Sequence, residues 1–89
     1  MKLWWMLLPL MASQPVRVEY KCWLEDSLGR ERIVFFLWYP NRARQEQLQL
    51  PGRALVEEPA EVNRVMECQL GRERFRSPRA RALEQLTPR

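Results

Sequence analysis

The chain has 89 residues, with 15 basic and 11 acidic side chains, no histidine and two cysteines. A chain this short forms one small domain, near the size at which burial of apolar surface only just outweighs chain entropy. Without histidine it lacks the commonest general base, and it has no glycine-rich phosphate loop, so we expect a protein that is not an enzyme and binds no cofactor. The net charge of +4 and the pI near 9.7 favour anionic partners.

Residues 1–13 have the pattern of a secretory signal peptide. Lys2 is the only early charge, an apolar run follows up to Ala12, and Ser13 adds a second small residue. The run is too short to span a bilayer, which takes about 20 helical residues. We therefore expect residues 1–13 to be removed and residues 14–89 to form a single mature domain. The alternatives are a permanent membrane anchor and a buried segment of the mature fold.

Two strands joined by a hairpin are predicted next. Residues 16–25 alternate apolar and polar side chains, as in a strand with one buried face. The segment DSLG at 26–29 is rich in turn residues and ends in a glycine that can take a positive φ. Residues 30–39 are apolar on both faces over most of their length, which favours the central strand of a sheet. Pro40 ends this strand because proline cannot donate to the ladder.

The stretch NRARQEQLQLPG is ambiguous. Residues 43–47 could form a helical turn, but Leu48 and Leu50 alternate with glutamines. Pro51 and Gly52 fit the two central positions of a type II turn. We favour a third, short strand that ends at this turn.

An acidic loop and a fourth strand follow. We interpret residues 54–61 as a solvated surface rather than a cation site, because calcium requires a denser set of oxygen ligands. Residues 62–70 alternate like a strand. On this pattern Val65 faces one side of the strand. The opposite side carries Val62, Met66, Cys68 and Leu70.

The last predicted element is a helix that begins at Ser77. A hydroxyl N-cap followed by proline is a typical helix start. The helix runs to about Leu86, with Ala80 and Leu83 on the same apolar stripe, and Phe75 is expected to fill the core beneath it. The predicted fold class is therefore α+β: a small four-stranded, mainly antiparallel sheet with one C-terminal helix on one face.

The two cysteines, Cys22 and Cys68, each lie on the apolar side of a predicted strand. Zinc needs about four ligands, usually closely spaced cysteines or histidines, and a reactive thiol needs a neighbouring base. Neither pattern is present, so we predict no metal site. In an exported chain the simplest interpretation is a disulfide that joins the first and fourth strands. If export is wrong, both cysteines remain as buried, reduced thiols.

The C-terminal residues are rich in arginine. Six arginines fall within residues 71–89, against Glu73 and Glu84. Such a segment can bind phosphates of nucleic acid, lipopolysaccharide or lipid headgroups, or it can simply be a solubilising surface. Trp23, on the otherwise polar face of the first strand, either marks a contact surface or covers a second apolar layer. The candidate partner-binding residues are Trp23, Arg72, Arg74, Arg76, Arg79 and Arg81.

The order of several short motifs resembles one protein family. In chain order these are YKC at 20–22, IVFF at 33–36 with Trp38, LPG at 50–52, Val65 with Glu67 and Cys68, Phe75, and LTPR at 86–89. Together they are similar to the small exported proteins of the Tap type, associated with type IVa pilus or secretion systems. The resemblance covers nearly the whole mature chain. It implies a periplasmic or secreted accessory protein that binds a protein component of this machinery and has no catalytic residues.

These observations favour a non-catalytic binding or assembly factor of a type IVa pilus or secretion system, acting through a sheet edge and exposed aromatic surface. A second hypothesis is an exported cationic protein that binds polyanions, such as DNA or lipopolysaccharide, through its arginine-rich C-terminal segment. A third is a small inhibitor of a cell-envelope enzyme. No residue in the chain selects this third hypothesis.

Overall fold

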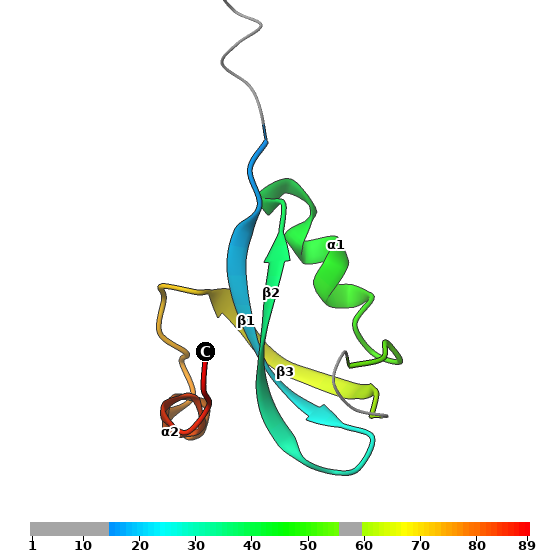
Figure 1. The fold of residues 1–89 in the computed structure, drawn as a ribbon, viewed down its shortest axis with the longest axis vertical. Coiled ribbons are helices and arrows are strands. Elements are labelled where there is room, and N and C mark those ends of the chain that lie inside the picture. Colours follow the sequence, from blue (N-terminus) through cyan, green and yellow to red (C-terminus); the bar gives the residue numbers. More distant parts are fainter. Residues whose placement is uncertain (1–14, 56–59) are drawn as a thin grey trace, which may run out of the picture.

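The computed structural model describes residues 15–55 and 60–89. The fold is α+β, with a three-stranded antiparallel sheet and an α-helix on each of its two faces (Figure 1). The predicted signal peptide, residues 1–13, lies outside the described residues. The elements in chain order are β1 (Val18–Asp26), β2 (Glu31–Trp38), the 3-10 helix η2 (Pro40–Arg42), α1 (Ala43–Leu48), β3 (Val62–Leu70) and α2 (Pro78–Gln85).

The strand order is β2-β1-β3, so β1 is central and both β2 and β3 are edge strands. The prediction that residues 30–39 form the central strand is therefore wrong. The two apolar faces of β2 have a different cause: one faces the core under α1 and the other faces the core under α2. An apolar pattern reports which faces are covered, and it carries no information about how many neighbouring strands are paired.

The predicted third strand is also wrong, because its residues form η2 and α1 instead. Pro40 occupies the first position of η2, where its missing N–H costs nothing, and the following arginines and glutamines are good helix formers. The two leucines then separate: Leu48 is 74 % exposed, whereas Leu50 is fully buried. The predicted turn is confirmed, since Gly52 has a φ of +88° and the Arg53 amide donates to the Leu50 carbonyl over 2.9 Å. Because this segment forms a helix instead of a strand, the sheet has three strands rather than four, and the fold has a second α-helix.

The larger core lies between the sheet and α1. Alternate residues of β1 point to this face, and Leu50 and Ala43 close it from the helical side. The aromatic ring of Trp38 stacks on Phe36, with 4.8 Å between ring centroids. The buried members of this core are Tyr20, Cys22, Leu24, Trp38, Ala43, Leu50 and Val62.

A second, smaller core lies between the opposite face of the sheet and α2. Phe75, 1 % exposed, is packed with Ile33 and Ala80, which confirms its predicted place beneath the helix. The predicted N-cap is also confirmed, because the Ser77 hydroxyl accepts a hydrogen bond from the Ala80 amide over 3.3 Å. Leu86 is 81 % exposed, so the apolar stripe of α2 ends one turn earlier than predicted.

β3 contains two irregularities that change which side chains face the larger core. Leu24 is opposite Val65 and Trp23 is opposite Glu67, so Met66 has no partner in the ladder. A second register shift falls between Glu25 and Asp26. Each extra residue reverses the alternation along β3. The prediction that Val65 faces away from the other apolar residues is therefore wrong, because it packs against the larger core.

The predicted disulfide is confirmed. Cys22 on β1 lies directly opposite Cys68 on β3, and the two sulfur atoms are 2.01 Å apart. The bond spans a sequence separation of 46 residues and pins an edge strand to the central strand. In a domain this small, such a link contributes a large share of the stability.

Candidate functional site

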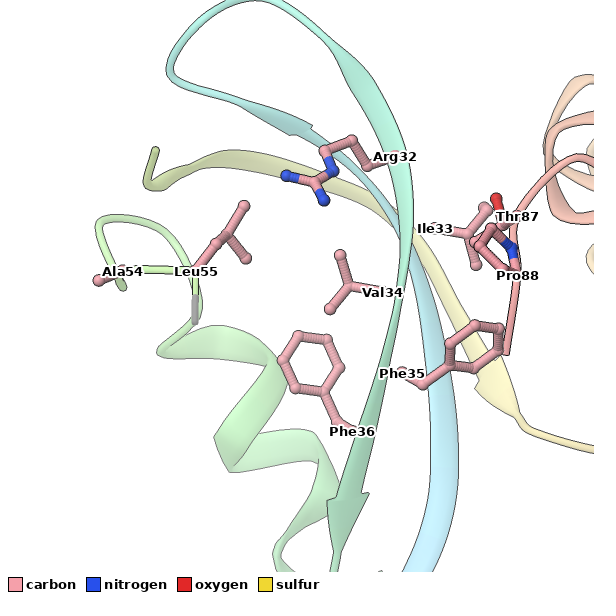
Figure 2. Close-up of a pocket in the computed structure, with 9 residues that line it drawn as sticks. All are labelled: Arg32, Ile33, Val34, Phe35, Phe36, Ala54, Leu55, Thr87 and Pro88. Atoms are coloured by element: carbon pink, nitrogen blue, oxygen red, sulfur yellow. The ribbon is translucent and has the colours of Figure 1, made fainter. Parts of the chain in front are cut away.

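A groove of about 450 Å³ lies along β2 (Figure 2). Five consecutive residues of the strand, 32–36, contribute to its lining. Consecutive side chains of a strand point to opposite faces, and the inner edge of β2 is paired with β1. A single cavity lined by both faces of β2 must therefore open at the outer, unpaired edge of the strand.

Two walls flank this edge, one on each face of the sheet. Figure 2 shows Val34 and Phe36 pointing toward the same side as Leu55, in the segment that follows α1. It shows Ile33 and Phe35 pointing to the other side, where the C-terminal segment passes β2. The remaining residues that line the groove are Arg32, Ala54, Thr87 and Pro88.

The C-terminal segment is held in place by specific contacts. The Thr87 hydroxyl donates to the Leu83 carbonyl over 2.9 Å, which continues the last turn of α2. The Arg89 guanidinium lies 4.5 Å above the ring centroid of Phe35 and pairs with Glu19 over 3.0 Å. This wall of the groove is thus attached to both β1 and β2.

The β1–β2 hairpin is fixed by the buried side chain of Asp26. Its Oδ1 atom accepts hydrogen bonds from the amides of Leu28 and Arg30, both over 2.9 Å, and its Oδ2 atom accepts from Arg30 Nε over 2.9 Å. Burial of this carboxylate raises its pKa, but the amide and guanidinium of Arg30 and the amide of Leu28 together outweigh burial, so the pKa is lowered. The carboxylate stays ionised and sets where β2 begins.

Trp23 and Arg79, two of the predicted partner-binding residues, converge on Glu31 at the start of β2. Arg79 donates from Nε and Nη2 to the two carboxylate oxygens over 2.8 and 2.7 Å, and the Trp23 indole donates to Oε1 over 3.0 Å. The Arg79 hydrogen bond is the main cause of the lowered pKa of Glu31, followed by Trp23. Trp23 is half-buried against the smaller core, and Arg79 links α2 to β2. Their predicted role in partner binding remains a prediction.

The other predicted arginines belong to the connection between β3 and α2 or to the first turn of α2. Arg81 donates to the carbonyls of Phe75 and Arg76 over 2.7 and 2.9 Å, so it holds this connection against the helix. The side chains of Arg72, Arg74 and Arg76 are exposed. The structure therefore divides the predicted partner-binding arginines into two, Arg79 and Arg81, that form hydrogen bonds attaching α2, and three exposed ones in the connection before it.

Glu67 of β3 holds the same connection from the sheet side. It accepts hydrogen bonds from the amides of Arg76, over 2.6 Å, and Ser77, over 3.3 Å. Partial burial raises the pKa of Glu67, but these amides and the side chain of Gln69 lower it by more. On the other side of α2, buried Lys21 donates to both oxygens of Glu84 over 3.0 and 2.9 Å. The helix and the connection that precedes it are thus bonded to all three strands.

Within residues 15–55 and 60–89, no three acidic, cysteine or histidine residues lie close enough together to bind a metal ion. None of the helices in the described ranges combines the length and the apolar character needed to cross a membrane.

The groove along β2 was not predicted from the sequence. Its walls come from Leu55 and from residues 87–88, which are distant in the chain and become neighbours only through the fold. One sequence signal did exist: residues 33–36 are apolar on both faces, more than an ordinary edge strand needs. The same pattern is also typical of a central strand, which is the position predicted from the sequence for residues 30–39.

Comparison with known protein families identifies the chain. A family model described as "Type IVa secretion system protein TapY2-like" matches residues 1–89, the whole sequence. The chain belongs to this family. The predicted resemblance to the Tap-type proteins is thereby confirmed, and the TapY2-like assignment associates the chain with a type IVa secretion system. No curated protein and no solved structure matches it.

Proposed function

We propose that this TapY2-like protein is a non-catalytic accessory protein, periplasmic or secreted, that binds a protein component of a type IVa pilus or secretion system. The family match over the whole chain carries this proposal. The Cys22–Cys68 disulfide supports a location outside the cytoplasm, because disulfides persist in oxidising compartments. The apolar run that ends at Ala12, with the features of a signal peptide, agrees with this location.

Binding fits the described residues better than catalysis does. Among the described residues, three carboxylates, those of Asp26, Glu31 and Glu67, have lowered pKa values, and all three accept structural hydrogen bonds. A general acid or base works best with a pKa near the operating pH, so these groups are poorly suited to that task. The walled outer edge of β2, in contrast, is a surface of the kind that recognises extended peptide segments.

The proposal is tested in cells that carry a type IVa system. Cells expressing the chain are fractionated, and the protein is detected with an antibody rather than a C-terminal tag, because Arg89 contacts Phe35. We expect the protein in the periplasmic or secreted fraction, without its leader, oxidised, and cross-linked to a component of the system. A full-length cytosolic protein with two free thiols would contradict the proposal.

Polyanion binding remains a second candidate because Arg72, Arg74 and Arg76 are exposed on one connection. The measurement is binding of a DNA duplex and of lipopolysaccharide at increasing salt. This candidate predicts an affinity that falls steeply with ionic strength and is lost when all three arginines are changed to glutamine. A matched control changes three other exposed arginines, Arg42, Arg44 and Arg53, to glutamine. Salt-insensitive binding of a pilus or secretion component favours the first proposal instead.

A further inference from the structure

We propose that the outer edge of β2 takes up one extended, predominantly apolar strand from a partner protein, which becomes the fourth strand of the sheet. This inference rests on the proposed binding role, and it names the surface and the chemistry of the partner. An edge strand normally carries charges, proline or a bulge that prevent further pairing. Residues 33–38 of β2 have none of these, and their register with β1 is uninterrupted.

The hydrogen-bonding direction of β1 can be worked out from its contacts with β3. The Cα atoms of Cys22 and Cys68 are 4.0 Å apart, the short distance of a pair that exchanges no backbone hydrogen bonds. The Gly71 amide donates to the Glu19 carbonyl over 2.8 Å, so odd-numbered residues of β1 are the ones directed to the β3 side. Even-numbered residues of β1, Cys22 included, therefore direct their backbone groups toward β2.

This alternation determines which groups of β2 are free to pair. Cys22 is opposite Val34, so Val34 and, by alternation, Phe36 use their backbone groups on the inner side. The N–H and C=O groups of Ile33, Phe35 and Leu37 then point outward, along the unpaired edge. Three residues at a spacing of two are the pattern that an added strand needs for a ladder. Leu37, in addition, is 61 % exposed.

The walls define the side chains of the incoming strand. On one face it would meet Val34, Phe36 and Leu55, and on the other face Phe35 and Pro88. Most residues of both walls are apolar, with Arg32 as the charged member on the Leu55 side and Thr87 as the polar member on the Pro88 side. Successive side chains of a strand point to opposite faces. The best-fitting segment is therefore apolar at consecutive positions rather than at every second one. A segment of about five such residues matches the groove lining at residues 32–36.

The same walls argue against a second copy of this chain as the occupant. Pairing β2 with β2 of another copy would bring a second Leu55 wall and a second C-terminal wall to the same stretch of edge. An eight-residue edge is about 26 Å long, and alone it buries too little surface for a stable dimer, which needs roughly 1,200 Å² or more. A single narrow strand fits between the walls and is buried on both faces.

The test uses the oxidised, exported protein and a soluble peptide with the core Val-Ile-Val-Phe-Val flanked by lysine and glutamate. The peptide with its central valine changed to proline is the control probe. Amide hydrogen exchange is followed by NMR. We expect saturable binding that slows exchange at Ile33, Phe35 and Leu37 by at least about tenfold, while the inward amides of Val34 and Phe36 change little. The proline peptide should leave all five amides unaffected.

Two variants with a matched control complete the experiment. Leu37→Pro removes an outward N–H, and Leu37→Lys places a guarding charge on the edge without altering the backbone. Both should weaken peptide binding at least about tenfold. Leu48→Lys makes the same exchange at an exposed leucine of α1, outside the groove, and should bind like the parent protein.

Three results would overturn the inference. The first is no protection of the outward amides by the peptide, and the second is protection that Leu37→Lys leaves intact. The third is protection that grows with protein concentration without peptide, which identifies a second copy as the occupant. Failure here is distinguishable from failure of the proposed function. A chain that is exported and cross-linked to a secretion component, yet shows no edge protection, retains the binding role and loses only this surface.

Discussion

The two edge strands of the sheet are built in opposite ways. β2 is regular along its whole pairing with β1, and both its faces are apolar between Ile33 and Phe36. β3 is interrupted by two register shifts and carries exposed Asn63 and Arg64 at its beginning. It is also joined to β1 by the disulfide.

The fold thus protects the β3 edge and leaves the β2 edge able to pair. Bulges and charges are the usual means by which edge strands avoid adding a further strand. In β3 both are present, and Glu25 of β1 fixes the polar end by accepting hydrogen bonds from Asn63 and Arg64 over 2.9 and 3.3 Å. In β2 neither interrupts residues 33–38. A difference of this kind within one small sheet is expected when one edge serves recognition.

The largest effect should come from removing the covalent link of β3. The double change Cys22→Ser and Cys68→Ser reopens a loop of 46 residues and should lower the free energy of unfolding by about 4 kcal/mol in the chain-entropy model. The β1–β2 hairpin keeps its short turn, so β3 should be the first strand to lose amide protection. Urea unfolding and hydrogen exchange measure both effects. An unchanged melting temperature would show that the disulfide contributes little to the fold.

A smaller effect concerns the attachment of α2 to β3. Glu67→Gln removes the charge that accepts hydrogen bonds from the amides of Arg76 and Ser77, and should lower the free energy of unfolding by about 1–2 kcal/mol.

Folding lowers the pKa values of Glu67, Glu31 and Asp26 from ordinary values of 4.5, 4.5 and 3.8. The unfolded chain therefore takes up protons first, and stability present above about pH 4.5 should be lost as the pH falls further.

Urea unfolding at pH 7 and pH 3 tests this pH dependence. Glu67→Gln should lose less stability between the two pH values than the parent protein does, because the variant lacks one of the titrating groups. Glu73→Gln is a suitable control, since the Glu73 side chain is exposed and its nearest ion pair, with Arg72, is 3.9 Å long. Equal losses in the parent protein and in Glu67→Gln would contradict the assigned role of Glu67.

Deletion of Met66 would remove one of the two register shifts of β3 and make its edge more regular, as the edge of β2 is. The ladder already skips this residue, so the deletion leaves Val65 opposite Leu24 and Cys68 opposite Cys22. We expect a folded, oxidised protein that is less stable by about 1 kcal/mol, a typical cost for losing a half-buried contact. Its β3 edge becomes regular from Val65 onward, so sedimentation should reveal association that increases with concentration. A monomer at all concentrations would mean that the bulge does not guard this edge.

The smallest effect on stability should come from the β2 edge itself. Leu37→Lys changes a side chain that is 61 % exposed, and the free energy of unfolding should stay within about 0.5 kcal/mol of the parent value. Thermal unfolding of this variant beside Leu48→Lys measures the difference. A markedly larger loss for Leu37→Lys would indicate that Leu37 has a packing role, and would weaken its use as a probe of strand addition.

Much of the local structure could be predicted because it depends on neighbouring residues. The hairpin at 26–29, the turn at Gly52 and the N-cap at Ser77 were all correct, since a turn or cap is specified by a few consecutive side chains. The failures were at positions where distant segments decide. The apolar and polar side chains of residues 43–48 alternate only weakly, so this pattern is compatible with a strand or a helix. In the structure these residues form the helix α1, and Leu50, which follows it, is buried in the larger core.

The candidate site shows the same division. Of the predicted partner-binding residues, Arg79 and Arg81 are engaged in attaching α2, and Trp23 lies partly beneath it, because the helix folds back over that face of the sheet. In the sequence, Arg72, Arg74 and Arg76 alternate along one segment, and Arg79 and Arg81 follow in the predicted helix. Their actual separation depends on the connection between Glu67 and Ser77, whose path is fixed by hydrogen bonds from the amides of Arg76 and Ser77 to Glu67.

By itself, the sequence determined three of the four predicted strands, the disulfide partners and the family, because alternation, cysteine chemistry and motif order are properties of the chain alone. Only the tertiary structure decided the strand order, and with it the existence of an open edge beside two largely apolar walls. The physical reason is that an apolar strand has the same pattern whether its backbone is paired on one side or on both. Hydrogen bonds between strands join residues far apart in the chain, and no local pattern records them.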